Sequence, residues 1–221
     1  MGTAIMIAIV GAESTGKTTL AAALAPRLAQ LSGLKVCWVP EVLRDWCDQQ
    51  GRTPRADEQA TIAEAQHQRI DTAAADHEVV ICDTTALMTA VYSRLIFGDS
   101  ALDARAMTLH RRMSLTLLTA LDLPWVADGL QRDGPQVRAP VDALLREWLM
   151  AHGVPWSVVG GSGRMRLERA VDAVAPLLRR AAAPGSGLFT RLESRNAAAA
   201  AQAWTCERCN DADCEHLLAR R

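Results

Sequence analysis

The sequence lacks any excess of positive charge. Its 221 residues include 24 lysines and arginines against 25 aspartates and glutamates, for a formal net charge of −1. Broad nonspecific binding to nucleic acid requires a basic surface, so we expect no nucleic-acid partner. A local basic groove for a small phosphorylated ligand is still compatible with this balance.

The sequence also lacks an apolar run of membrane-spanning length, so no membrane partner is expected. Its first residues have no basic segment and no cleavage site of the kind found in signal peptides, and we interpret them as a core strand. Gly2 does not begin a myristoylation motif, because Met6 stands where that motif requires Ser or Thr. These absences predict a cytoplasmic protein without disulfides. They are compatible with a homo-oligomer.

Apolar segments of strand length alternate with segments of helical pattern. The strand-like segments are almost continuously apolar and rich in β-branched residues, as is typical of parallel strands buried on both faces. They span residues 4–10, 35–41, 78–84, 114–121 and 155–161. A helix follows the first of them, and further helices are expected over 56–76, 86–97, 101–113, 139–152 and 163–181, with 86–97 able to continue into 101–113.

This alternation predicts an α/β fold with a doubly wound, parallel five-stranded sheet and flanking helices. Ligands of such sheets bind beyond the carboxyl ends of the strands. The composition changes near residue 181, where "AAAPGSG" is typical of a linker. We therefore predict one domain over residues 1–181, followed by a linker and a short Cys-rich tail over 182–221.

The segment "GAESTGKT", residues 11–18, matches the pattern G-x-x-x-x-G-K-[ST] between a strand and a helix. Glycines allow the backbone to approach a ligand closely, and the N–H groups of the loop and helix can then cradle phosphate oxygens. The alternative is an ordinary glycine turn that caps a helix. We assign nucleotide binding to Gly11, Glu13, Ser14, Thr15, Gly16, Lys17, Thr18 and Thr19. The fold is thus predicted to be a P-loop NTPase with the strand order 2-3-1-4-5, which uses ATP.

"VVICDTT" delivers Asp83 to the carboxyl edge of the sheet, opposite the loop. An aspartate in this position can hold Mg²⁺ together with the hydroxyl of Thr18, or act in catalysis, as can Lys17. The alternative is that Asp83, Thr84 or Thr85 caps the following helix.

"WVPEVLRDW" places Glu41 at the end of the second strand and Arg44 one turn later. Glu41 could accept the proton of an attacking hydroxyl or hydrogen-bond a ribose diol, and Arg44 could neutralise phosphoryl charge. A surface ion pair is the alternative. Gln59, Gln66 and His67 follow on a polar helix face that either contacts substrate or is simply solvated.

"PWVADGLQRDGPQVR", residues 124–138, combines glycines with arginines after the fourth strand. A loop of this kind suits a lid that closes over phosphates, with Arg132 in catalysis and Arg138 on the nucleotide. Trp125 and Asp128 are candidates for the acceptor pocket, although Trp125 could be a core residue. A solvated loop with incidental arginines is the alternative.

Taken together, these segments resemble the ribosylnicotinamide kinase domain of NadR and its single-domain AAA-type relatives. That family combines a "GxExxGKS/T" loop, an "E-x-x-R" segment, a "D-T" strand end and a "W-x-x-D-G-x-R" lid. The matching residues here are Glu13, Glu41, Arg44, Asp83, Thr84, Trp125, Asp128, Gly129 and Arg132, within about residues 4–180. This chain departs from the family at Thr85, where Asp or Asn is usual, and at Gln131, where some members carry arginine.

The resemblance implies transfer of the γ-phosphoryl group of Mg·ATP to the 5′-hydroxyl of nicotinamide riboside, which yields nicotinamide mononucleotide for NAD biosynthesis. A different class of function is a P-loop ATPase that acts as a nucleotide-dependent regulatory switch for a protein partner. An enclosed acceptor cleft between Glu41, Asp83 and the lid would favour the kinase, whereas a shallow or filled region would favour the switch.

Cysteine and histidine gather at the end of the sequence, as C-x2-C-x4-C-x-H. Cys206, Cys209, Cys214 and His216 are enough ligands for a closed, structural zinc site. A flexible acidic tail with reduced thiols and a docked helix are the alternatives. Cys37, Cys47 and Cys82 lie in apolar or helical surroundings and are expected to pack as small hydrophobic residues.

Overall fold

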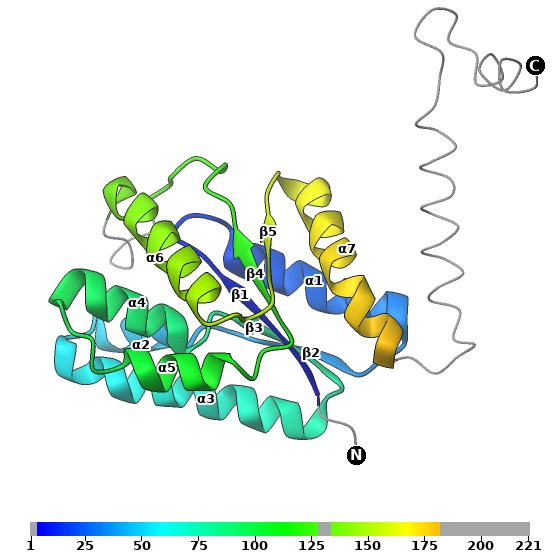
Figure 1. The fold of residues 1–221 in the computed structure, drawn as a ribbon, viewed down its shortest axis with the longest axis horizontal. Coiled ribbons are helices and arrows are strands. Elements are labelled where there is room, and N and C mark those ends of the chain that lie inside the picture. Colours follow the sequence, from blue (N-terminus) through cyan, green and yellow to red (C-terminus); the bar gives the residue numbers. More distant parts are fainter. Residues whose placement is uncertain (1–3, 128–133, 182–221) are drawn as a thin grey trace, which may run out of the picture. The chain divides into compact units, whose positions relative to one another are not determined.

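Five parallel strands form the central sheet of this protein, whose computed structural model describes residues 4–127 and 134–181 (Figure 1). The strand order is β2-β3-β1-β4-β5, which confirms the predicted order 2-3-1-4-5. The strands are β1 (Ile5–Val10), β2 (Val36–Val39), β3 (Val79–Asp83), β4 (Leu115–Thr119) and β5 (Trp156–Val159). Central β1 pairs with β3 on one side and β4 on the other, so that Ile7 lies between Ile81 and Leu115.

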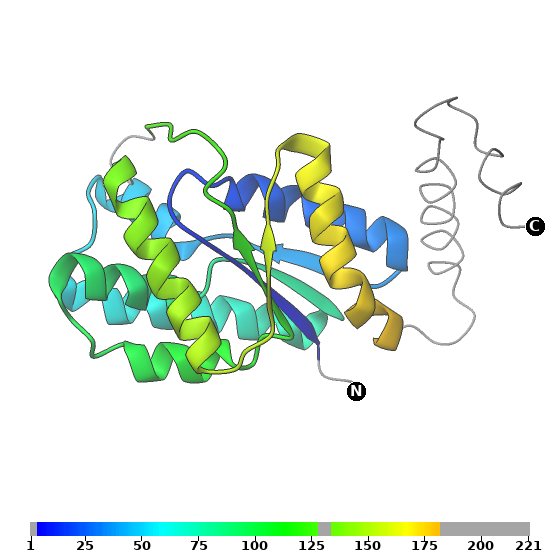
Figure 2. The same ribbon diagram turned by 45° about the horizontal axis from the view of Figure 1, so that its top comes forward.

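Helices cover both faces of the sheet, which explains why the strands are apolar almost without interruption. Ile7, Ala8, Ile9 and Val10 of β1 are all fully buried, although successive side chains point to opposite faces. Met6, Ala8 and Val10 belong to a core cluster with side chains of α3, α4, α5 and α6. The other face is covered by α1 and α7, and Figures 1 and 2 show the two groups of helices from different directions.

The helices follow the predicted segments closely, with one addition. They are α1 (Lys17–Ser32), α2 (Val42–Gln50), η1 (Ala56–Glu58), α3 (Gln59–Asp76), α4 (Ala86–Phe97), α5 (Asp103–His110), η3 (Pro135–Val137), α6 (Arg138–Ala151) and α7 (Gly163–Ala181), where η marks a 3₁₀ turn. In α1, Leu20, Leu24 and Leu28 recur at the helical period and are buried on one face, and Leu31 is half-buried.

Two features of the helices differ from the sequence-based expectation. Helix α2, which begins at Val42, was not predicted, because its nine residues are mostly polar and carry only a short apolar stripe. The continuation of α4 into α5 is wrong, since Gly98 adopts φ +67° and its N–H closes the end of α4 on the carbonyl of Arg94.

The structure describes most of the first predicted domain but none of the second. Met1–Arg180 forms one compact unit by its internal contacts. Residues 182–221 lie outside the described residues, so the boundary at 181 and the separate tail remain predictions.

Candidate functional site

The glycine loop, residues 11–18, joins β1 to α1 at the carboxyl edge of the sheet. Gly11 has φ +147°, and a Cβ at this position would lie only 2.1 Å from the hydroxyl oxygen of Thr119 in β4. Gly16 caps α1 with φ +74°, in the left-handed region that favours glycine. Both glycines of the motif are therefore demanded by the conformation of the loop, and the N-terminus of α1 follows directly, as a phosphate cradle requires.

Side chains inside the loop hold its backbone in this shape. The ammonium of Lys17 donates to the carbonyl of Ala12 at 2.8 Å, and the hydroxyl of Thr15 donates to the same carbonyl at 2.7 Å. The hydroxyl oxygen of Thr15 also lies 2.7 Å from that of Thr119. Because the Thr15 side chain links the loop to β4, only the main chain of Thr15 is placed for the predicted contact with nucleotide.

Asp83 ends β3 with a buried carboxylate. Its side chain is 1% exposed, and among residues 4–127 and 134–181 neither of its oxygens has a hydrogen-bond partner of good geometry. Burial raises the pKa of Asp83, whereas the nearby Thr18 hydroxyl, Lys17 and Arg44 lower it. Open carboxylate oxygens beside a threonine hydroxyl are oxygen donors of the kind that Mg²⁺ prefers, so Thr18 and Asp83 fit the predicted metal site.

The cap of α4 is a neighbour of Asp83 rather than Asp83 itself. The hydroxyl of Thr85 accepts a hydrogen bond from the N–H of Leu87 at 3.3 Å, as an N-cap does. Thr84 between them has φ +69°, an uncommon conformation for a residue with a branched side chain. Thr85 is therefore the residue that caps α4, and the carboxylate of Asp83 remains available for a ligand or metal ion.

Glu41 and Arg44 come from the start of α2 and face the same region as Lys17. Burial raises the pKa of Glu41 most strongly; Lys17 lowers it, the charge of Asp83 raises it, and Arg44 and the Thr84 hydroxyl lower it. Glu41 precedes α2 without capping it through its side chain, so its carboxylate is available to a ligand. Both residues line the cavity described next, instead of forming a pair on the outer surface.

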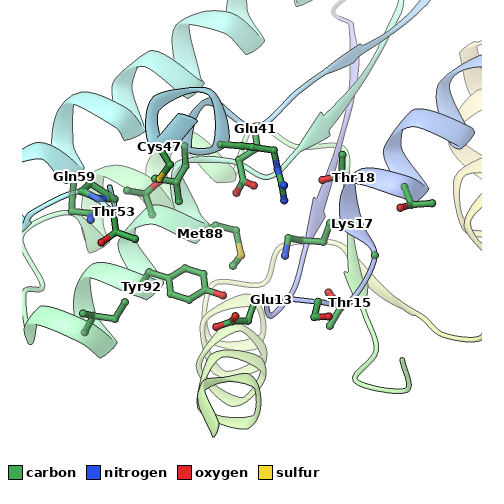
Figure 3. A pocket seen from close by; sticks show the side chains of 18 of the residues that line it. Glu13, Thr15, Lys17, Thr18, Glu41, Cys47, Thr53, Gln59, Met88 and Tyr92 are labelled. Atoms are coloured by element: carbon green, nitrogen blue, oxygen red, sulfur yellow. The ribbon is translucent and has the colours of Figure 1, made fainter. Parts of the chain in front are cut away.

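A cavity of about 510 Å³ opens beside the glycine loop (Figure 3). This volume lies within the range of about 300–1,000 Å³ that is usual for small-molecule sites. Loop residues 13–19 form one side of it, and α2, the start of α3 and α4 form the rest. Its remaining lining residues are Glu41, Leu43, Arg44, Cys47, Thr53, Pro54, Gln59, Met88, Thr89, Tyr92, Ile96 and Phe97.

Hydrogen bonds attach the segment after β4 to the glycine loop. The indole N–H of Trp125 donates to Glu13 Oε2 at 3.4 Å, and the N–H of Val126 donates to Ser14 Oγ at 2.8 Å. Ser14 itself has φ +57°. Trp125 is half-buried against the loop and does not line the cavity, so its predicted contact with the acceptor is indirect at most.

The predicted lid is described only at its two ends. Asp128, Gly129 and Arg132 lie outside the described residues, and their roles remain predictions. Arg138 begins α6, and its guanidinium donates to the carbonyls of Leu121 at 3.3 Å and Leu123 at 2.9 Å. In this arrangement Arg138 stabilises the segment after β4 and does not line the cavity, so a contact with nucleotide would require it to exchange partners.

The wall contributed by α4 was missed by sequence reasoning. Met88, Tyr92 and Ile96 recur at intervals of four residues, which places them on one side of α4, toward the cavity, and Phe97 at the end of the helix also lines it. In the structure, Ile96 and Phe97 are apolar yet 48% and 40% exposed at the end of the helix. The sequence carries no signal of this, because a cavity-facing stripe has the same spacing as a core-facing one.

The three polar residues of α3 fall into different roles. Gln66 accepts a hydrogen bond from the N–H of Val42 at 2.7 Å and so fixes the beginning of α2. His67 is largely covered; its Nε2 lies 3.2 Å from Asp71 Oδ2 and 3.3 Å from the guanidinium of Arg112, and it does not line the cavity. Gln59 lines the cavity. Cys47 and Cys82 are buried as free thiols and Cys37 is half-buried, in accordance with packing as small hydrophobic residues.

Comparison with known proteins identifies the family of this chain. A family model described as an AAA domain matches residues 6–166. The chain belongs to this AAA domain family. Comparison with curated protein sequences gives no match.

Several solved structures share the fold of this AAA domain. A NadR protein in complex with NR is 20% identical with a TM-score of 0.63, over 79% of this chain and 50% of that one. A NadR protein in complex with NAD and AMP-PNP is 21% identical with a TM-score of 0.61, over 79% and 49%. A thymidylate kinase from Ehrlichia chaffeensis is 14% identical with a TM-score of 0.55, over 80% and 100%. This chain therefore spans about half the length of the NadR proteins, and the expected P-loop fold and NadR-type resemblance are confirmed.

Across residues 4–127 and 134–181, no helix has both the length and the apolar character to cross a membrane. In the same part of the chain, no three His, Cys, Asp or Glu side chains gather as ligands for a metal ion. Cys206, Cys209, Cys214 and His216 lie outside it, so the zinc site remains a prediction, which metal analysis of untagged protein would test at about one equivalent per chain.

Proposed function

We propose that this protein is an ATP-dependent kinase that transfers the γ-phosphoryl group of Mg·ATP to a hydroxyl of a nucleoside, with nicotinamide riboside as the acceptor and nicotinamide mononucleotide as the product. The observation that carries the proposal is the cavity of about 510 Å³ next to the glycine loop. It provides room for an acceptor beside Lys17, where the γ-phosphate would lie. The similarity to NadR structures supports the choice of acceptor.

The nucleotide end of the site works mainly by positioning and electrostatics. Main-chain N–H groups of the loop and the N-terminus of α1 bind the phosphates, and the ammonium of Lys17 exchanges the carbonyl of Ala12 for phosphate oxygens. Thr18 and Asp83 hold Mg²⁺, which neutralises phosphate charge when bound. Glu41 then accepts the proton of the attacking hydroxyl, since burial raises the pKa of its carboxylate and so makes it a stronger base.

The alternative of a regulatory switch is less well supported by the same region. A switch needs nucleotide binding but no second pocket, whereas here two glutamates and an arginine face an acceptor-sized cavity that adjoins the loop. Arg44 lies where it can neutralise charge on the transferred group. The cavity has a direct use in phosphoryl transfer to a second substrate, whereas a protein that only binds or hydrolyses ATP does not need it.

Acceptor-dependent turnover tests the proposal. With Mg·ATP, we expect nicotinamide riboside to stimulate ADP production at least tenfold, with nicotinamide mononucleotide formed in equal amount, and unrelated nucleosides to have much smaller effects. Strong hydrolysis of ATP that is independent of any nucleoside would instead support the switch. Absence of ATP binding by well-folded protein would reject both.

A further inference from the structure

The charged and neutral polar side chains of the cavity are separated in space. Glu13, Lys17 and Glu41 lie together at one side, next to the glycine loop, as Figure 3 shows. Gln59 lies on the opposite side, beyond Cys47 and Met88. The reacting hydroxyl of an acceptor must be near the γ-phosphate and therefore near Lys17. The opposite end of the acceptor then points toward Gln59.

Gln59 has an unused amide in this position. Its side chain is only 5% exposed, and no hydrogen bond links that amide to any part of residues 4–127 and 134–181. Gln59 is not among the described residues whose buried polar atoms lack a partner, which places its amide against the open space of the cavity. Because Gln59 lines the cavity, a ligand or water can supply the missing hydrogen bonds.

Thr89 repeats this pattern from α4. It is 7% exposed, lines the cavity, and its hydroxyl has no hydrogen bond within the described part of the chain. Among the described lining residues, the charged ones are Glu13, Lys17, Glu41 and Arg44, which belong to the loop and the start of α2. The lining residues nearest to Gln59 in the chain, Thr53 and Pro54, are uncharged. Arg52, next to Thr53, is already paired with Glu58 at 2.6 Å, so this end of the cavity offers hydrogen bonding without an unpaired cation.

We propose that Gln59 is a specificity-determining residue that binds a neutral, carboxamide-like group at the end of the acceptor remote from its reacting hydroxyl. The glutamine amide donates one hydrogen bond and accepts another, which complements a carboxamide. A carboxylate in the same place would be desolvated without a cation to neutralise it, at a cost well above that of a neutral group. The proposal rests on the nucleoside kinase function proposed above, and it names the residue that distinguishes one nucleoside acceptor from another by the group on its heterocycle.

The test compares three acceptors with two proteins, as a chemical double-mutant cycle. The acceptors are nicotinamide riboside, nicotinic acid riboside, and pyridine riboside, which lacks the carboxamide. The proteins are wild type and Gln59→Leu, which keeps the size of the side chain. In wild type, kcat/KM should fall about tenfold when the carboxamide is removed and further when it becomes a carboxylate. In Gln59→Leu, nicotinamide riboside should lose about tenfold, mainly through KM, and removal of the carboxamide should then cost less than about twofold.

Gln68→Leu is the matched control, because Gln68 is exposed on the same helix, away from the cavity. It should leave all three kcat/KM values within about twofold of wild type. The proposal would be overturned if removal of the carboxamide lowered kcat/KM by the same factor in Gln59→Leu as in wild type, so that the two changes were additive. It would also be overturned if removal of the carboxamide left the kcat/KM of wild type unchanged. The second result needs no variant and so decides even if Gln59→Leu fails to fold. Turnover of none of the ribosides by wild type would reject the kinase function itself, together with this inference.

Discussion

The two sides of the cavity are built in different ways. The phosphate side consists of consecutive residues 11–18, and it works through backbone conformation that two glycines make accessible. The acceptor side is assembled from α2, the start of α3 and α4, segments that are separated in the chain by up to about 50 residues. It works through side chains, of which Gln59 and Tyr92 are examples.

This difference predicts how each side responds to change. A backbone cradle tolerates substitution of its neighbours but depends on its one ammonium and its metal ligands. A wall of side chains contacts the acceptor and not the phosphates, so single substitutions there should act on acceptor binding and have smaller effects than loss of the ammonium. The predictions below test that contrast, in order of expected size.

Removing the ammonium of the loop should have the largest effect. We expect Lys17→Ala to lower kcat at least about 1,000-fold, because the charge that stabilises the transferred phosphoryl group is lost. The melting temperature should stay within a few degrees of wild type, since Lys17 is not a core residue. Lys35, the only other lysine of the sequence, is exposed, and Lys35→Ala is the control, with activity unchanged. Near-normal kcat in Lys17→Ala would contradict the mechanism.

Asp83→Asn should separate activity from stability. Loss of a metal ligand should lower kcat about 100-fold. Burial raises the pKa of Asp83, so its ionised form disfavours folding and stability from this group is lost as the pH rises through its pKa. The neutral amide removes this penalty, and ligand-free Asp83→Asn should melt at a higher temperature than wild type at pH 7. Asp76→Asn, at an exposed site, should change neither quantity; a lower melting temperature for Asp83→Asn would contradict the prediction.

The stability of the fold around the start of α4 should depend on the buried side chain of His110. His110 Nδ1 lies 3.0 Å from the Thr85 hydroxyl, which caps α4, and its Nε2 lies 2.8 Å from the hydroxyl of Thr116. Burial lowers the pKa of His110 to about 4. The unfolded chain, with a histidine pKa near ~6.5, therefore binds a proton first as the pH falls, and stability should drop by about 3 kcal/mol between pH 6.5 and 4.

Denaturant unfolding at several pH values measures this dependence. His110→Gln should show a drop smaller than wild type by about that 3 kcal/mol, because acidic groups contribute equally to both proteins. His152→Gln, at an exposed position, should behave as wild type. An identical pH dependence in His110→Gln and wild type would show that His110 is not held neutral in the fold.

The smallest effect is expected from the wall itself. Tyr92 lines the cavity from the middle of α4, and Tyr92→Ala should raise KM for the acceptor about tenfold through lost aromatic contact. KM for ATP should stay within about twofold, because the phosphate side is independent of this residue. Leu95→Ala on the same helix, outside the cavity lining, should leave both constants unchanged. A parallel rise in KM for ATP would show that the two sides are not separable.

The same contrast between the two sides explains which features of the fold and of the site could be predicted from the sequence. The strand order, both loop glycines, Lys17 and the strand-end residues Glu41 and Asp83 were all expected, since each belongs to a local pattern or to a strand end. Helix α2 and the α4 wall were not, because their polar or apolar residues have the same spacing as ordinary surface and core positions. Asp83 as a free carboxylate and Thr85 as the cap could be distinguished only by their contacts.

The sequence by itself determined the fold and the phosphate side, because continuous apolar strands and a glycine loop are encoded by neighbouring residues whose conformational preferences do not depend on distant parts of the chain. The tertiary structure alone decided the acceptor side. Whether Gln59, Tyr92 and Glu41 face one another depends on how α2, α3 and α4 pack on the sheet, and that packing is set by many weak contacts that no local pattern records.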